Sequence, residues 1–160
     1  MSEVTELLER YRRGTELVGD AIAGADETEL DFKPAPDKWS ARYIVSHLAD
    51  TEATSVVRLR QIIAEDNPTL VPWNQDAWAA STGYERRKPS ESLATMRQLR
   101  SDNYELLKDL PAEAWSRTAN HLERGTMTLL DFLRIFARHA EAHAEQIRKV
   151  RAAYRDRQSN

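Results

Sequence analysis

Two histidines in the last third of the chain, His139 and His143, are four residues apart. At 3.6 residues per turn, such a pair lies on one face of an α-helix, so the two imidazoles can converge on one ion. Imidazole nitrogen is a good ligand for zinc, nickel and related divalent metals. Pairs at this spacing also occur on ordinary helix surfaces, so the spacing by itself does not distinguish a metal site from a surface pair.

The residues around this pair form the pattern of a long amphipathic helix. Counting about 100° per residue places His143 at the edge of an apolar stripe and His139 just outside it, with Gln146 beside them. Both histidines can therefore face into a helical bundle without lying in the middle of its core. The stripe consists of Leu129, Leu130, Leu133, Phe136, Ala137, Ala140, Ala144 and Ile147.

A third histidine, His47, has a similar position in an earlier helical segment. It lies about 60° from Ile44, just off the buried arc of that segment. Two interpretations are open at this point: His47 supplies a third nitrogen ligand, or it is a core-edge histidine hydrogen-bonded to a backbone carbonyl. The arc is marked by Ile44, Leu48, Val56, Ile62 and Ile63.

Three further side chains are candidates for supporting roles. Asp50 and Gln146 each lie three residues from a candidate ligand, where they can accept the second ring N–H of a metal-bound histidine. Asp50 is equally well interpreted as an exposed carboxylate. Glu52 falls inside the apolar arc, which suits either a general base or proton shuttle, or an acceptor for a structural hydrogen bond from a Trp or Tyr.

The fourth histidine, His121, follows Asn120 in a segment without helical periodicity, close to Glu123 and Arg124. We expect it to be a solvated loop histidine.

The longest irregular stretch, residues 68–89, carries Trp73, Trp78 and Tyr84, with one short helix expected near residues 75–80. A long aromatic loop in a compact domain can be a lid or a substrate wall. It can also be a hydrophobic plug over the end of a bundle.

Four segments with helical periodicity are expected to position these residues. No strand pattern accompanies them, and prolines and short polar stretches separate them. The sequence therefore predicts a single all-α domain over residues 1–160, a four-helix bundle of up-down-up-down order. Ser40, Ser90 and Thr128 are the expected caps of the last three helices. The expected helices cover about residues 3–23, 40–64, 90–110 and 128–154.

The composition excludes several classes of function. The chain of 160 residues has 41% hydrophobic and 31% charged side chains and a net charge of −3. Without a basic block we expect no nucleic-acid partner. The absence of cysteine excludes disulfides, zinc–thiolate sites and cysteine nucleophiles, so a reacting thiol would have to come from a substrate. We find no signal-peptide pattern and no membrane span, so the cytoplasm is the expected compartment.

Two sequence motifs resemble those of a known family. The sequence HLADTE at residues 47–52, preceded by KPAPDKWS at 33–40, resembles the second-helix signature of the DinB/YfiT-like superfamily. The sequence HAEAHAEQI at residues 139–147 resembles its last-helix signature, H-x-x-x-H-x-x-Q-I. The two motifs have the family's order and separation, and the resemblance covers nearly the whole chain.

The resemblance implies a four-helix bundle in which His47, His139 and His143 bind a divalent metal. Members of the superfamily include metal-dependent hydrolases, and transferases that use bacillithiol, mycothiol or glutathione. Many members are homodimers, so a homodimer is the expected assembly. Fold and metal ligands do not identify the reaction.

A divalent ion on three neutral imidazoles keeps positions open for water or substrate. We therefore expect an enzyme that activates a hydroxide for hydrolysis, or the thiolate of a small thiol co-substrate for transfer to a small molecule. The expected metal is zinc or nickel, with iron, cobalt and manganese as further candidates. The alternatives are a non-catalytic metal-binding or small-molecule-binding bundle in stress response, and a bundle whose site serves only dimerisation.

Overall fold

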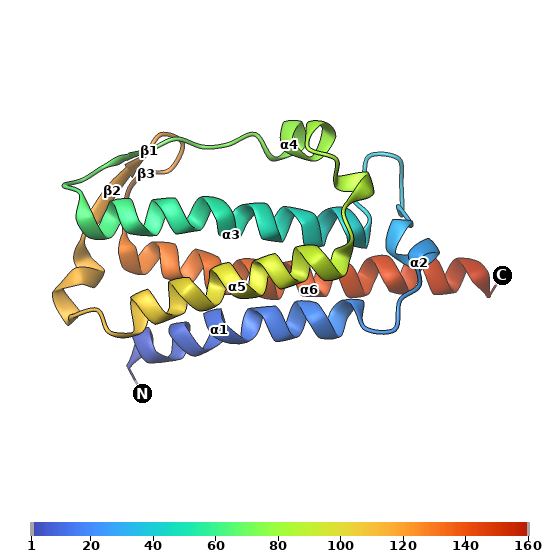
Figure 1. Ribbon diagram of the computed structural model, residues 1–160, viewed down its shortest axis with the longest axis horizontal. Coiled ribbons are helices and arrows are strands. Elements are labelled where there is room, and N and C mark those ends of the chain that lie inside the picture. Colours follow the sequence, from blue (N-terminus) through green and yellow to red (C-terminus); the bar gives the residue numbers. More distant parts are fainter. Residues whose placement is uncertain (1, 160) are drawn as a thin grey trace.

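Four long helices dominate the computed structural model, which describes residues 2–159 (Figure 1). The caps explain where three of them begin, because the side chains of Ser2, Ser40 and Thr128 each accept a backbone N–H from the first turn. The third long helix begins at Pro89, whose fixed φ suits a first turn, so the expected cap at Ser90 is wrong. The four are α1 (Glu3–Ile22), α3 (Ala41–Ala64), α5 (Pro89–Lys108) and α6 (Leu129–Gln158).

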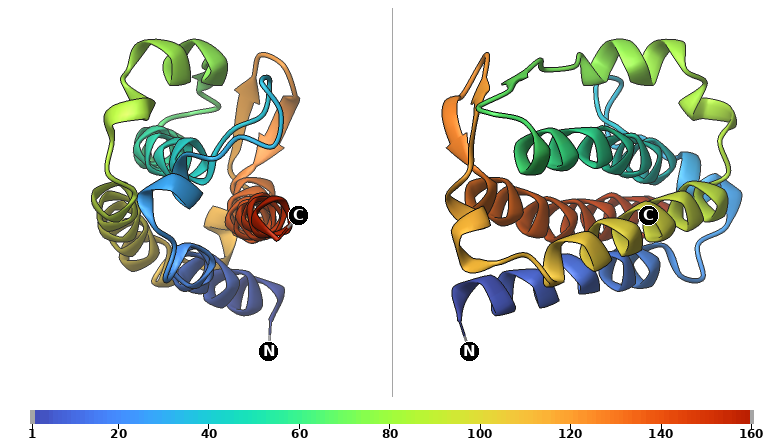
Figure 2. Two further views of the ribbon diagram at one scale, coloured as in Figure 1. Left: turned by 90° about the vertical axis from the view of Figure 1, so that its right-hand side faces the viewer. Right: turned by 60° about the vertical axis from the view of Figure 1, so that its left-hand side comes forward.

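The order of helix directions differs from the expected up-down-up-down arrangement. Helices α1 and α6 run one way along the bundle, and α3 and α5 both run the other way (Figure 1). Seen along the helices, α1 and α3 lie at diagonally opposite corners, and each packs against α5 and α6 (Figure 2). Helices α3 and α5 can run in parallel because residues 65–88 return from the end of α3 along the whole bundle. Extended chain of that length reaches roughly twice as far as a helix of 24 residues, which is the length of α3.

Short elements occupy the connections. The first contains α2 (Glu27–Asp31), and the returning one contains α4 (Gln75–Ser81) and the 3-10 turn η1 (Tyr84–Arg86). Residues 68–89 thus run along the side of the bundle above α3, rather than over its end (Figure 1). The last connection begins with the 3-10 turn η2 (Ala112–Ser116).

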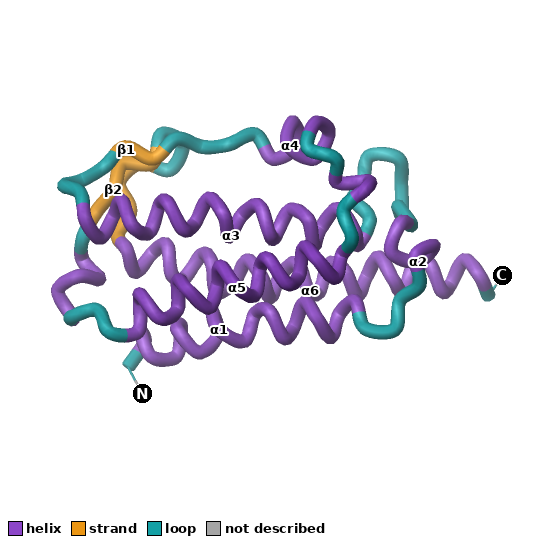
Figure 3. The backbone as a smooth tube through the Cα atoms, in the orientation of Figure 1, coloured by secondary structure: helices purple, strands orange, loops and turns teal. Residues whose placement is uncertain are grey.

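A small sheet, which the sequence did not predict, lies at one end of this layer (Figure 3). Strands β2 (Thr118–His121) and β3 (Gly125–Thr128) form an antiparallel hairpin, and β1 (Thr69–Leu70) pairs in parallel with β2. These strands are too short to show an alternating pattern, and β1 comes from a distant part of the chain. No helix within residues 2–159 is both long and apolar enough to cross a membrane.

Candidate metal centre

Three histidines from two helices converge between α3 and α6. His47 lies on α3, and His139 and His143 lie one turn apart on α6. The Nε2 atom of His139 is 3.3 Å from Nε2 of His47 and 3.1 Å from Nε2 of His143. One ligand atom from each of the three lies within 4.8 Å of the others. The structure thus brings together the three histidines that the sequence singled out.

The separations of these nitrogens fit a common metal ion. Imidazole nitrogens bind zinc at about 2.0–2.1 Å, so two ligands of one ion lie about 2.9 Å apart at a right angle and about 3.4 Å apart at a tetrahedral angle. The distances of 3.1 and 3.3 Å to His139 lie between these limits. The donor set is therefore suited to a divalent ion without rearrangement of the helices.

The surroundings keep these imidazoles neutral. Burial, with His143 nearby, lowers the pKa of His47 to about 3. Burial and the other two histidines lower the pKa of His139 to about 2. Burial also lowers the pKa of His143, against the opposing effect of its hydrogen bond to Gln146. A neutral imidazole offers a lone pair to a metal, whereas a protonated one does not.

Gln146 lies where it can select the tautomer of His143. Its side-chain oxygen is 2.7 Å from Nδ1 of His143, so Nδ1 carries the proton and donates it to that oxygen. Nε2 then presents its lone pair to the other histidines. The Nδ1 atoms of His47 and His139 are buried, and neither has a hydrogen-bond partner within residues 2–159.

Asp50 has other partners than a histidine. Its carboxylate accepts a hydrogen bond from the Tyr84 hydroxyl at 2.8 Å and one from Arg87 at 2.7 Å. Both partners belong to the segment that returns over α3, which the local pattern around Asp50 could not reveal. Asp50 therefore connects this segment to α3, and the structure does not place it in the expected supporting role.

Glu52 lies in a buried ion pair at the centre of the bundle. Its carboxylate accepts hydrogen bonds from Nε of Arg100 at 2.8 Å, from Nη2 of the same side chain, and from the Tyr11 hydroxyl at 2.8 Å. Glu52 and Arg100 are each 1% exposed. Of the two interpretations of Glu52, the geometry favours the acceptor of structural hydrogen bonds, since Tyr11 and Arg100, which donate to it, come from α1 and α5.

Aromatic side chains cover His47. Its ring lies 5.1 Å from the ring of Trp39 and 5.6 Å from that of Trp73, which is stacked on it. Trp73 also packs against Trp78 at 4.5 Å. The aromatic segment 68–89 therefore forms a wall beside the histidines. A wall was one of the two interpretations that the sequence left open for this segment, but nothing in the sequence indicated which tryptophan would touch a histidine.

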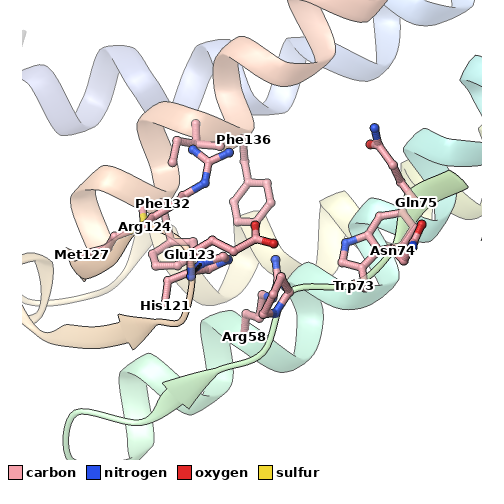
Figure 4. A pocket seen from close by; sticks show the side chains of 12 residues that line it. Arg58, Trp73, Asn74, Gln75, His121, Glu123, Arg124, Met127, Phe132 and Phe136 are labelled. Carbon is pink, nitrogen blue, oxygen red and sulfur yellow. Dashed lines mark hydrogen bonds between the residues drawn. The ribbon is translucent and has the colours of Figure 1, made fainter.

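The expectation for His121 is wrong, since its side chain is only 5% exposed. His121 ends β2, and the pairing of this strand with β1 and β3 carries it into the interior. It lines a cavity of about 420 Å³ whose wall also includes Trp73 and Phe136 (Figure 4). Trp73 is thus shared between this cavity and the histidine cluster.

A helical bundle with three converging neutral histidines defines the class of candidate three-histidine metalloproteins. The sequence profile of the DinB superfamily matches residues 8–147, and the chain therefore belongs to this superfamily.

Relatives and similar structures agree with this assignment. A protein of Oceanobacillus iheyensis, named "Putative metal-dependent hydrolase", is 29% identical over 132 residues, which cover 82% of this chain and 76% of the relative. YfiT from Bacillus subtilis, described as "a probable metal-dependent hydrolase with an unusual four-helix bundle topology", superposes with a TM-score of 0.88 at 23% identity, over 94% of this chain and 87% of YfiT. A mycothiol-dependent maleylpyruvate isomerase superposes with a TM-score of 0.73 at 16% identity, over 91% of this chain and 61% of the isomerase. The solved structures show that the fold is shared.

Proposed function

We propose that this protein is a metal-dependent hydrolase of small molecules, with a divalent ion bound by His47, His139 and His143. One observation carries the proposal: the Nε2 atoms of His47 and His143 lie 3.3 and 3.1 Å from Nε2 of His139, separations that match two ligands of a common ion, and ligand atoms of all three lie within 4.8 Å of one another. The "metal-dependent hydrolase" in the name of the relative from Oceanobacillus iheyensis supports the reaction type.

Three neutral ligands leave the positive charge of such an ion uncompensated. When bound, the ion lowers the pKa of a coordinated water or thiol and so supplies a nucleophile at neutral pH. The side chains of the protein hold the site in place. Gln146 fixes the tautomer of His143, and the tryptophan rings beside His47 shield one side of the cluster from water.

Imidazole ligation suits zinc or nickel first, and iron, cobalt or manganese next. Because the chain has no cysteine, a thiol nucleophile would be a separate co-substrate. We therefore propose thiol transfer as the second reaction to be tested. We also propose that the active assembly is a homodimer, which light scattering of the purified protein would test.

The metal site is tested by elemental analysis of purified protein after incubation with zinc, nickel and manganese. We expect one ion per chain in the unaltered protein and loss of that ion in His143→Ala. His121→Gln, which alters a histidine outside the cluster, is the matched control and should keep its metal. Unaltered protein that remains free of all three metals would overturn the proposal.

The reaction is tested with metal-loaded protein on panels of esters, amides and lactones. Hydrolysis should disappear in the presence of a chelator and in His143→Ala. A parallel assay with monochlorobimane and a panel of small thiols tests transfer. Acceleration of conjugation without any hydrolysis would replace the hydrolase by the transferase.

A further inference from the structure

The cavity beside the histidine cluster has a positively charged end. Arg58 of α3 lies there together with His121 of β2 and Arg124 of the turn between β2 and β3, and we call these three residues the cationic end (Figure 4). Glu123 lies beside them, and Trp73 lies at the other end of the cavity (Figure 4). Trp73 is stacked on His47, so this residue of the cavity wall contacts the histidine cluster, although none of the three histidines lines the cavity itself.

The donors of the cationic end outnumber their acceptors. Arg58 donates one hydrogen bond, from Nη2 to the carbonyl of Val71 at 2.8 Å. The side chain of Arg124 has neither a hydrogen bond nor an ion pair with any residue between 2 and 159. An arginine has five N–H donors, so both guanidinium groups retain donors that no protein acceptor uses.

His121 adds a further donor. Its Nδ1 accepts the backbone N–H of Glu123 at 3.2 Å, so the ring proton of the neutral form is on Nε2. Within the described part of the chain, no protein acceptor takes the Nε2–H of His121. The residue lines the cavity, and its Nε2 is not among the buried unpartnered polar atoms of the described residues, so this donor is accessible to a ligand in the cavity.

The charges at this end are also unbalanced. Burial and the nearby Arg124 lower the pKa of Arg58, and only Glu123 acts in the opposite direction. With His121 neutral, two guanidinium groups and one carboxylate give a net charge of +1. A ligand with one negative charge balances this end, whereas a dianion would leave an excess of negative charge.

We propose that the cavity binds a small molecule with one carboxylate, which the cationic end holds through Arg58, Arg124 and His121. The apolar surfaces of Phe136 and Trp73 contact the body of the molecule. The other end of the molecule then lies against Trp73, whose ring is stacked on His47 of the proposed metal site. Because this proposal names the class of substrate, it rests on the proposed function. Binding of the carboxylate itself does not require the metal.

The test measures the binding of 3-phenylpropionate and of its neutral amide by calorimetry at constant ionic strength, with metal-free and zinc-loaded protein. We expect the carboxylate to bind at least tenfold more tightly than the amide in both forms. Arg124→Gln should weaken carboxylate binding about tenfold or more, which is the usual effect of a charge-assisted hydrogen bond, and leave amide binding unchanged. Arg13→Gln, an exposed arginine of α1, is the matched control and should change neither.

Arg124 is exposed and has no side-chain hydrogen bond or ion pair within residues 2–159, so its replacement leaves the fold intact. Arg58→Lys provides a second variant that keeps the charge but loses the planar set of donors, and it should also weaken carboxylate binding. Equal affinity for acid and amide, no binding of either, or unchanged affinity in Arg124→Gln would overturn the proposal. Tighter binding of inorganic phosphate than of the carboxylate would also overturn it.

The two proposals fail separately. If carboxylate binding persists in protein that never takes up metal, only the proposed function is wrong. If the protein takes up metal through the three histidines but does not distinguish acid from amide, only the carboxylate site is wrong.

Discussion

Replacing Glu52 with glutamine removes one charge from the centre of the bundle and preserves the shape of the side chain. In the native protein the Glu52 carboxylate is the only negative charge bonded to Arg100 within residues 2–159. The other partners of this guanidinium are the carbonyls of Tyr11 at 3.0 Å and Phe136 at 3.4 Å. Neutral carbonyls cannot replace the lost charge, so the variant leaves a buried cation without a counter-ion.

The expected cost is large. Removing one partner of a buried ion pair costs about 3–5 kcal/mol, because the remaining charge stays desolvated. That is a considerable part of the roughly 5–15 kcal/mol by which a domain is usually stable. Replacing both partners, as in Glu52→Gln with Arg100→Met, removes the uncompensated charge. The double variant should therefore lose much less stability than the sum of the two single variants.

The assay is urea unfolding followed by far-ultraviolet circular dichroism, with metal content measured on the same samples. Glu141→Gln is the matched control, since its ion pair with Arg10 is partly exposed and should contribute less than about 1 kcal/mol. A loss of less than 1 kcal/mol in Glu52→Gln, or additive effects in the double variant, would refute the reasoning. Normal stability together with lost hydrolysis would instead assign Glu52 to catalysis.

Three further predictions concern helix packing, a helix cap and the histidine cluster. Gly14→Ala should lower the free energy of unfolding by about 1–3 kcal/mol, because the new Cβ would lie 2.2 Å from Nη1 of the buried Arg100. Gly19→Ala is the comparison, because the nearest neighbour of its Cβ is the flexible end of an exposed arginine. In urea unfolding this variant should be more stable than the native protein. The hydrogen bonds from Thr128 hold the pKa of Asp131 below its ordinary value of 3.8, so its stabilising effect is present above that value and is lost as the pH falls through the folded-state pKa. The difference in stability between native protein and Asp131→Asn should therefore shrink below about pH 4, and a difference that grows there would contradict this. Gln146→Leu should weaken zinc affinity about 10- to 100-fold in competition with a chelator, and unchanged affinity would show that the tautomer of His143 is fixed by other means.

The features that the sequence predicted well are those that depend on neighbours along one helix. Helical phase and the family motifs predicted that His139, His143 and His47 would lie close together, and the structure groups them. Thr128 forms its capping box with Asp131 as expected. These properties follow from the 3.6-residue period and from contacts within one turn.

The features that it missed depend on distant segments. The burial of His121 follows from the pairing of β2 with β1, which begins some fifty residues earlier. The partners of Asp50 come from the returning segment, and the counter-ion of Glu52 comes from α5. Periodicity within one helix carries no information about which side chains another segment will place against it.

The diagonal placement of α1 and α3 has a consequence for synthesis on the ribosome. Helix α1 emerges first, but the helices that cover its apolar face, α5 and α6, begin only at residues 89 and 129. Helix α3, the next long helix to emerge, lies across the bundle centre and cannot substitute for them (Figure 2). The nascent chain must therefore carry an uncovered apolar surface on α1 until the last long helix has been made, and chaperones have that interval in which to bind it.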